Sequence, residues 1–190
     1  LIGGLAGDAL TDADSNVAVG YAALTTDTLG SSSTAIGRLT LSEQNFTSAT
    51  NTYNTAVGAQ AGQKVSTGVN NTLIGGLAGD AITTANSNTA VGQNALSTTT
   101  TGANNVSIGY QSLLDNTSGA SNAALGYRAL ANNTTADNNT AVGTDALFTN
   151  TTGTNNVAVG YQAGTAVTTA GEATLIGRHA GLALTTGNSN

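Results

Sequence analysis

The sequence predicts an all-β fold, a parallel β-solenoid in which each repeat forms one coil and the coils stack along a single axis. Three observations lead to this prediction: a strict repeat length, a short β-branched segment in every repeat, and the absence of proline. A fixed repeat indicates an architecture in which each unit buries its apolar face against its neighbours. We expect about eleven coils in one array over residues 1–190, cut from a longer fibre.

The repeat length is set by a glycine that recurs along the whole chain. Of the ten intervals between successive members of this column, nine equal the interval from Gly126 to Gly143, which is seventeen. The exception, between Gly37 and Gly58, is longer by four and places a four-residue insertion within residues 42–53. We call these residues the anchor glycines and number each repeat from them as position 0: Gly3, Gly20, Gly37, Gly58, Gly75, Gly92, Gly109, Gly126, Gly143, Gly160 and Gly177.

The residues before each anchor glycine are typical of a short strand. Position −1 is Val, Ile or Leu in every repeat, as in the segment Asn139-Thr140-Ala141-Val142-Gly143. Short β-branched runs bounded by Asn and Gly favour a strand, and side chains alternate across it. Neither face of this strand is clearly polar, so we expect one face to line the coil interior and the other to contact a neighbouring chain. The pattern therefore favours an oligomer.

In each repeat, one of positions 4 and 7 carries a bulky apolar side chain and the other does not. Where position 4 is Leu, position 7 is polar, as in Leu130 with Asn133. Where position 4 is Gly, position 7 is apolar, as in Gly164 with Val167. Because protein interiors are close-packed, we expect a common pocket that holds one such group but not two.

Stacking of identical positions explains three further features. Proline would remove a ladder donor in every coil, and like charges in one column would repel at near contact. Arg128 and Asp145, a pair of charged residues adjacent in one column, have opposite signs. At position −4 asparagines recur, and stacked amides can hydrogen-bond along the axis; they include Asn71, Asn88, Asn105, Asn122, Asn139 and Asn156.

Composition excludes several classes of protein. Charged residues make up 7% of the chain, the net charge is −6 and only four side chains are basic, so we expect no nucleic-acid partner. No apolar run is long enough to cross a bilayer, and we expect no membrane insertion. The absence of cysteine leaves packing and backbone pairing as the sources of stability. We expect any secretion signal, anchor or tip domain to lie outside this window.

The repeat N-T-A-V-G-Y-x-A-L-x-x-N-T-T-G-x-N resembles the repeats of bacteriophage tail-fibre proteins and related bacterial surface proteins. Its core, present as Val17-Ala18-Val19-Gly20 and Val157-Ala158-Val159-Gly160, is similar to the head repeats of trimeric autotransporter adhesins. The resemblance implies a left-handed β-roll with three chains to a fibre. The adhesin repeat is shorter than the repeat of this chain, which is a departure in coil size.

Candidate sites are few. His179 lacks a nucleophile and a carboxylate in register, so we expect an inert, solvated side chain and no catalytic residue. Asp8, Asp12 and Asp14 are too few for calcium, which takes six to eight oxygens, and we expect no metal or cofactor. The insertion carries Phe46 and Tyr53, which suit either a binding loop or a bulge that fixes chain register. Position 1 holds tyrosines that suit an inter-chain interface or a glycan site, namely Tyr21, Tyr110, Tyr127 and Tyr161.

Our first interpretation is that the chain forms a non-enzymatic structural shaft, a homotrimeric fibre of a virion appendage or cell surface. It would project a receptor-binding tip for host attachment, and a host receptor or glycan would bind through regions outside this fragment. The alternatives are an adhesin head that binds ligands along its sides, and an ice-binding solenoid with threonines at positions 8 and 9, such as Thr83 and Thr84. A polysaccharide-cleaving enzyme would need clustered acids and bases that the composition barely permits.

Overall fold

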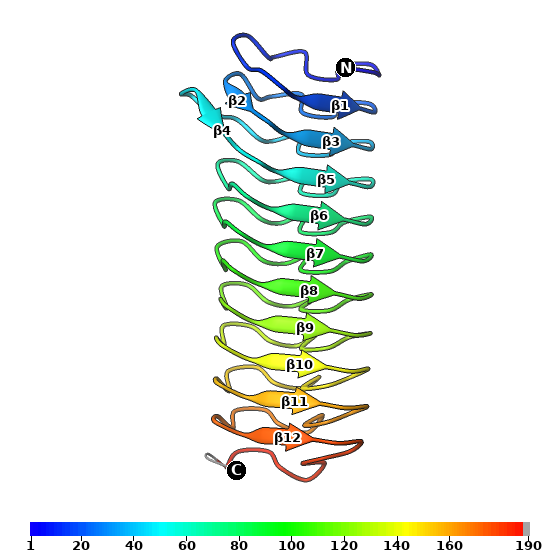
Figure 1. The fold of residues 1–190 in the computed structure, drawn as a ribbon, viewed down its shortest axis with the longest axis vertical. Helices are drawn as coiled ribbons and strands as arrows, with labels where there is room; N and C mark the ends of the chain where they lie inside the picture. The colour runs from blue at the N-terminus through cyan, green and yellow to red at the C-terminus, as the bar shows by residue number, and fades with distance from the viewer. Residues whose placement is uncertain (188–190) are drawn as a thin grey trace.

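The computed structural model of the protein describes residues 1–187 and is a rod of stacked coils without any helix in that range (Figure 1). Ten parallel strands of three residues form one continuous sheet along the rod, in sequence order and enclosing about nine turns. At about 4.8 Å per strand, this sheet is roughly 43 Å long. Its strands are β1 (Val17–Val19), β3 (Thr34–Ile36), β5 (Thr55–Val57), β6 (Thr72–Ile74), β7 (Thr89–Val91), β8 (Val106–Ile108), β9 (Ala123–Leu125), β10 (Thr140–Val142), β11 (Val157–Val159) and β12 (Thr174–Ile176).

Equal repeat positions lie directly over one another, which confirms the predicted parallel solenoid. Thr140 pairs with Val157 and Thr72 with Thr89, one repeat length apart in each case. Between β3 and β5 the chain also contains the insertion, yet the same positions still pair. The unit before β1 adds an isolated parallel bridge from Ile2 to Val19. The insertion therefore bulges from one coil without shifting the register of the sheet.

The anchor glycines stack because no other residue fits their column. At Gly92 the backbone φ angle is +134°, outside the region that side-chain-bearing residues adopt with ease. A Cβ atom built there would lie 2.6 Å from the carbonyl oxygen of Gly109 in the next coil. Both the conformation and the close approach of backbone to backbone thus require glycine.

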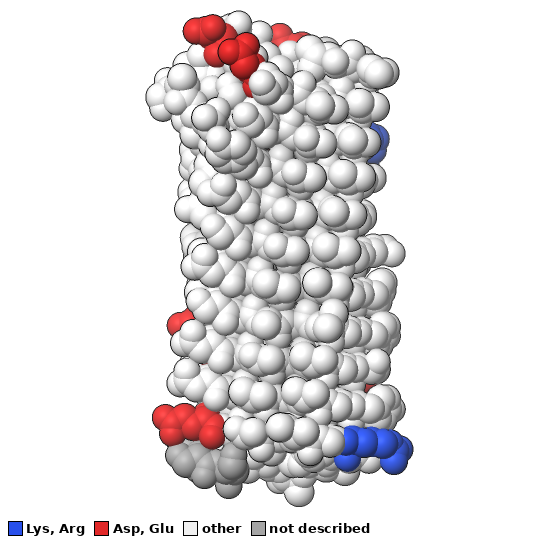
Figure 2. Space-filling view, in the orientation of Figure 1, with Lys and Arg blue, Asp and Glu red and all other residues white. Residues whose placement is uncertain are grey.

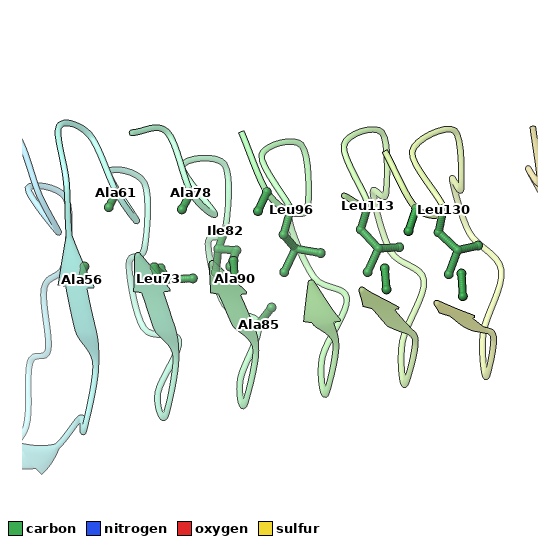
Figure 3. Packing of buried hydrophobic residues seen from close by; sticks show 14 of the residues in the cluster. Ala56, Ala61, Leu73, Ala78, Ile82, Ala85, Ala90, Leu96, Leu113 and Leu130 are labelled. Carbon is green, nitrogen blue, oxygen red and sulfur yellow. The ribbon is translucent and has the colours of Figure 1, made fainter. Parts of the chain in front are cut away.

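The core is a narrow column of alanine and leucine inside the coils (Figure 3). The central residue of most strands is alanine, as in Ala90 and Ala141, and it is fully buried. Leucines at position 4 fill the same interior, with Leu96, Leu113 and Leu130 stacked in successive coils. Small residues on the strand and larger ones opposite it set the thin cross-section of the rod.

The shared pocket predicted from positions 4 and 7 is confirmed, and a third position also uses it. A Cβ atom at Gly79 would lie 2.9 Å from Ile82 Cδ1 at position 7 and 2.7 Å from Leu73 Cδ2. Leu73 occupies position −2, which is alanine in most coils, and its methyl groups also lie over Gly62. Leucine at position −2 therefore explains which coils need glycine at position 4, and sequence analysis did not identify this contact.

A buried asparagine ladder runs through most of the sheet at position −4, from Asn54 to Asn156. Asn105 accepts a hydrogen bond at Oδ1 from the backbone N–H of Asn122 (3.0 Å) and donates through Nδ2 to the carbonyl of Gly119 (2.9 Å). The same bonds repeat from Asn54 to Asn156, and all these side chains are buried. The amides link the coils as predicted, although most of their bonds go to the backbone and not to each other.

A second polar ladder is buried where leucine occupies position 4. Nδ2 of Asn133 donates to Oδ1 of Asn116 (2.8 Å), and Nδ2 of Asn150 donates to Oδ1 of Asn133 (3.1 Å). The next residue in the column is Val167, so Oδ1 of Asn150 has no hydrogen-bond partner among the described residues. The ladder ends there because the coil changes to the form with glycine at position 4.

Candidate functional site

Within residues 1–187 no group of three or more His, Asp or Glu side chains lies close enough together to hold a metal ion. The ring of His179 lies against Tyr161, with 5.5 Å between centroids, and its Nε2 atom has no hydrogen-bond partner in the same range. Asp8 accepts a hydrogen bond from the Thr25 hydroxyl (2.6 Å). Burial raises the pKa of Asp80, and Lys64 partly opposes this effect. This part of the chain also has no surface pocket, so its candidate sites are flat surfaces.

The outward face of the ten-stranded sheet is uncharged from β1 to β12. We call it the sheet face and define it by the side chains at positions −3 and −1 of these strands. Position −1 is aliphatic throughout, and Ile108, Leu125 and Val159 are 36%, 48% and 36% exposed. Figure 2 shows no Lys, Arg, Asp or Glu over the middle of these strands, while charge lies toward the margins of the view.

Aromatic and cationic side chains gather on one edge of the rod, at positions 1, 2 and 5. Tyr110 and Tyr127 are stacked, with ring centroids 5.6 Å apart and planes 10° from parallel. The guanidinium of Arg128 lies 5.0 Å from the Tyr127 centroid and 4.5 Å from that of Phe148. Its Nε donates to Asp145 at 2.9 Å, which confirms the predicted pair of opposite charges, and this hydrogen bond raises the pKa of Arg128.

Three of the tyrosines on this edge have neighbours against their rings. Tyr127 contacts both Tyr110 and Arg128, and Tyr161 contacts both His179 and Arg178, whose guanidinium is 5.7 Å from the ring centroid. These contacts leave less ring surface free for sugar stacking at Tyr127 and Tyr161, while both side chains stay exposed, at 45% and 46%.

Two columns of hydroxyl residues follow a corner of the coils at positions 8 and 9. The Thr83 hydroxyl donates to the carbonyl of Thr100 (3.1 Å), and that of Thr117 donates to the carbonyl of Thr134 (2.9 Å). Position 9 is exposed in seven successive coils and is always Thr or Ser: Thr67, Thr84, Thr101, Ser118, Thr135, Thr152 and Thr169. The first column is bonded along the axis, and the second faces solvent.

The insertion is anchored by a buried carboxylate that sequence analysis did not identify. Oδ1 of Asp27 accepts from the backbone N–H groups of Gly30 (3.1 Å) and Phe46 (3.0 Å), and Oδ2 accepts from Gln44 Nε2 (2.6 Å). The short strands β2 (Gly30–Ser31) and β4 (Thr50–Asn51) pair beside it, and Figure 1 shows β4 standing out from the rod.

The two aromatic residues of the insertion have different environments. Phe46 is only 7% exposed, so its ring is part of the packing and not an available contact surface. Tyr53 is 59% exposed, and it alone of the two can meet a partner through its ring.

Comparison with known proteins adds no relative. No family model, curated protein or solved structure matches this chain. Within residues 1–187 no helix exists that could span a membrane. Function must therefore be inferred from the surfaces of the rod.

Proposed function

We propose that this chain is a non-enzymatic structural shaft of an extracellular or virion fibre, of the bacteriophage tail-fibre type. In this proposal three copies associate through their sheet faces, and the end units complete an array of about eleven coils. The shaft holds a receptor-binding tip at a distance from the particle or cell surface and catalyses no reaction. Its mechanical role follows from continuous main-chain ladders along the axis, supported by the two buried polar ladders.

The observation that carries this proposal is the uncharged aliphatic column on the outside of the rod. Large contiguous apolar surfaces on soluble proteins mark interaction sites. Here the column continues through all ten strands of the sheet, while ionic groups such as Lys64, Asp115 and Arg128 lie outside the strands. A second copy offers the same uncharged column and the same rise per coil, so it is the matching partner.

The energetics favour association that grows with the length of the shaft. Burying the remaining exposed part of one such aliphatic side chain contributes about 1 kcal/mol, because it is roughly two-fifths of the value for full burial. Because Val19, Val57, Val91 and Val142 are less exposed than this, ten strands contribute at most about 10 kcal/mol per chain, within the 4–15 kcal/mol that association costs. Because each further coil adds to the gain, a longer array associates more firmly than a short one.

Size-exclusion chromatography with light scattering tests this proposal. We expect three times the chain mass of 18.5 kDa. The double substitution Val91→Arg and Ile108→Arg places charge on two adjacent strands of the sheet face and should give monomers. As a control of equal charge, Thr101→Arg with Ser118→Arg alters exposed position-9 residues of two adjacent coils, off this face, and should leave the mass unchanged. A stably folded wild-type monomer would contradict the proposal.

An ice-binding solenoid is a second candidate, favoured by the unbroken exposed hydroxyl column at position 9. A regular, uncharged array of hydroxyl and methyl groups on a rigid backbone is suited to an ordered lattice of water. A thermal-hysteresis measurement decides between the candidates. If ice binds here, the wild type shows hysteresis that Thr101→Tyr with Thr135→Tyr abolishes, and a wild type without hysteresis excludes this function.

A further inference from the structure

The aromatic and cationic edge of the rod has an arrangement that the shaft role does not need. Every ring stack and cation–ring contact in the described residues lies between Tyr110 and His179, in the C-terminal half of the array. Several earlier coils carry small or aliphatic residues at the same positions, such as Gly76 and Leu77. We call this region, comprising Tyr110, Tyr127, Arg128, Tyr161 and Arg178, the Arg128 edge.

Arg128 is held in a fixed orientation with part of its guanidinium free. Tyr127 and Phe148 lie against the group at 5.0 and 4.5 Å, and Asp145 accepts a hydrogen bond from Nε. The two terminal amino groups make no hydrogen bond within the described part of the chain, and the side chain is 35% exposed. A guanidinium ordered in this way presents adjacent N–H donors that match a carboxylate.

Apart from Asp145, the residues at positions 1 and 2 around Arg128 are uncharged hydrogen-bonding groups. Gln111, Thr144 and Gln162 occupy positions 1 and 2 in three of the four coils from Gly109 to Gly160, and position 1 of every one of these coils but that of Thr144 is tyrosine. Each of these four coils carries at least one such uncharged residue, and the coils are spaced about 4.8 Å apart along the axis. The edge therefore offers a repeated set of polar contacts to an extended chain that lies along the rod.

We propose that the Arg128 edge binds a carboxylate-bearing saccharide chain along the side of the fibre. Peptides are usually recognised through a free strand edge, an apolar groove or a pocket, and no pocket exists in residues 1–187. A saccharide needs many polar contacts and few apolar ones, and its carboxylate group pairs with Arg128.

This inference rests on the proposed function only in that a displayed fibre meets surface glycans. Isothermal titration calorimetry on the full chain tests it, with a hexasaccharide of galacturonic acid as the probe. The methyl ester of this hexasaccharide and a hexaglutamate peptide serve as comparison ligands. Chain mass is measured separately, so a monomer that binds the saccharide would refute the trimer and leave this proposal standing.

The matched variants are Arg128→Gln and Arg38→Gln. Arg38 is exposed and bonds Gln60 (3.3 Å) but has no aromatic contact among the described residues, so its loss changes the net charge equally without touching the edge. We expect Arg128→Gln to weaken saccharide binding about tenfold or more, because it removes hydrogen bonds to a charged group, and Arg38→Gln to leave it within about twofold. Circular dichroism confirms that both variants are folded.

Binding of the acid saccharide with at least about tenfold weaker binding of its ester supports the proposal. Equal binding of acid and ester, equal effects of the two variants, or no binding of the acid saccharide overturns it. Equally tight binding of hexaglutamate would show attraction by charge alone and would also overturn it.

Discussion

Replacement of an anchor glycine by alanine should destabilise the rod strongly at one coil. In Gly92→Ala the new methyl group would lie 2.6 Å from the carbonyl oxygen and 2.7 Å from the carbonyl carbon of Gly109. Neither atom can move alone, because both belong to the backbone of the next coil. The residue also keeps a φ of +134°, which alanine adopts only under strain.

The expected loss of stability is about 2–5 kcal/mol. Backbone strain accounts for about 1–3 kcal/mol of it. Moving the next coil away weakens one or two ladder hydrogen bonds, each worth about 0.5–1.5 kcal/mol. The substitution Gly76→Ala is the matched control, because its Cβ atom would meet nothing within 4 Å and its backbone does not require glycine.

Urea unfolding followed by circular dichroism, at one fixed protein concentration, measures the difference between the two variants. Hydrogen exchange of the amides in the flanking coils then locates the effect, since coils of a solenoid interact mainly with their neighbours. Gly92→Ala should shift the midpoint to lower urea and speed exchange around positions 75–109, whereas Gly76→Ala should match the wild type. Equal midpoints for both variants would refute the stacked-glycine explanation.

Three further changes test other parts of the structure. Asn105→Ala removes three buried hydrogen bonds and should cost about 2–4 kcal/mol in urea unfolding, whereas Asn132→Ala, outside both buried ladders, should cost less than about 0.5 kcal/mol. Leu73→Ala should cost about 2–5 kcal/mol and lower the melting temperature, and an unchanged melting temperature would contradict its core role. Asp80→Asn should stabilise the protein at neutral pH, because the raised pKa of Asp80 means that its charged form disfavours folding. This gain should vanish as pH falls through the raised folded pKa to below the ordinary value of 3.8, and a gain independent of pH would contradict it.

Most of the fold could be predicted because the repeat itself encodes the register. The column of glycines fixes which residues stack, and the asparagines at position −4 and the Arg128–Asp145 pair follow from that register. Alternation along each strand correctly separated the alanine face from the β-branched face, and the structure places alanine inside. These features depend on one coil and its neighbour, which is the distance over which a repeat sequence is informative.

Contacts that differ from coil to coil could not be predicted in the same way. Leu73 departs from the common alanine, and its effect on the glycines at position 4 depends on the direction of its side chain across two coils. Asp27 meets Gln44 only through the path of the insertion, which has no repeat to set its register. Phe46 was expected among the interaction residues, but its burial follows from the same network.

The contacts between side chains on the surface of the rod were the hardest to predict from the repeat. Sequence alone identified the tyrosine column, yet the sandwich of Arg128 between Tyr127 and Phe148 joins positions 1, 2 and 5 of two coils. A single repeat does not reveal that contact. The trimer, the receptor-binding tip and the extracellular or virion location stay predictions for the same reason, since they concern what lies beyond one chain.

Distances between spin labels at equal repeat positions test the stacking of coils most directly. The chain has no cysteine, so pairs introduced at Thr84 with Thr135, Thr152 or Thr169 report only the chosen sites, and dilution with unlabelled protein removes contacts between chains. Pulsed electron paramagnetic resonance should give separations that rise by about 4.8 Å for each repeat, to about 14, 19 and 24 Å. Separations that do not increase in equal steps would contradict the stacked solenoid.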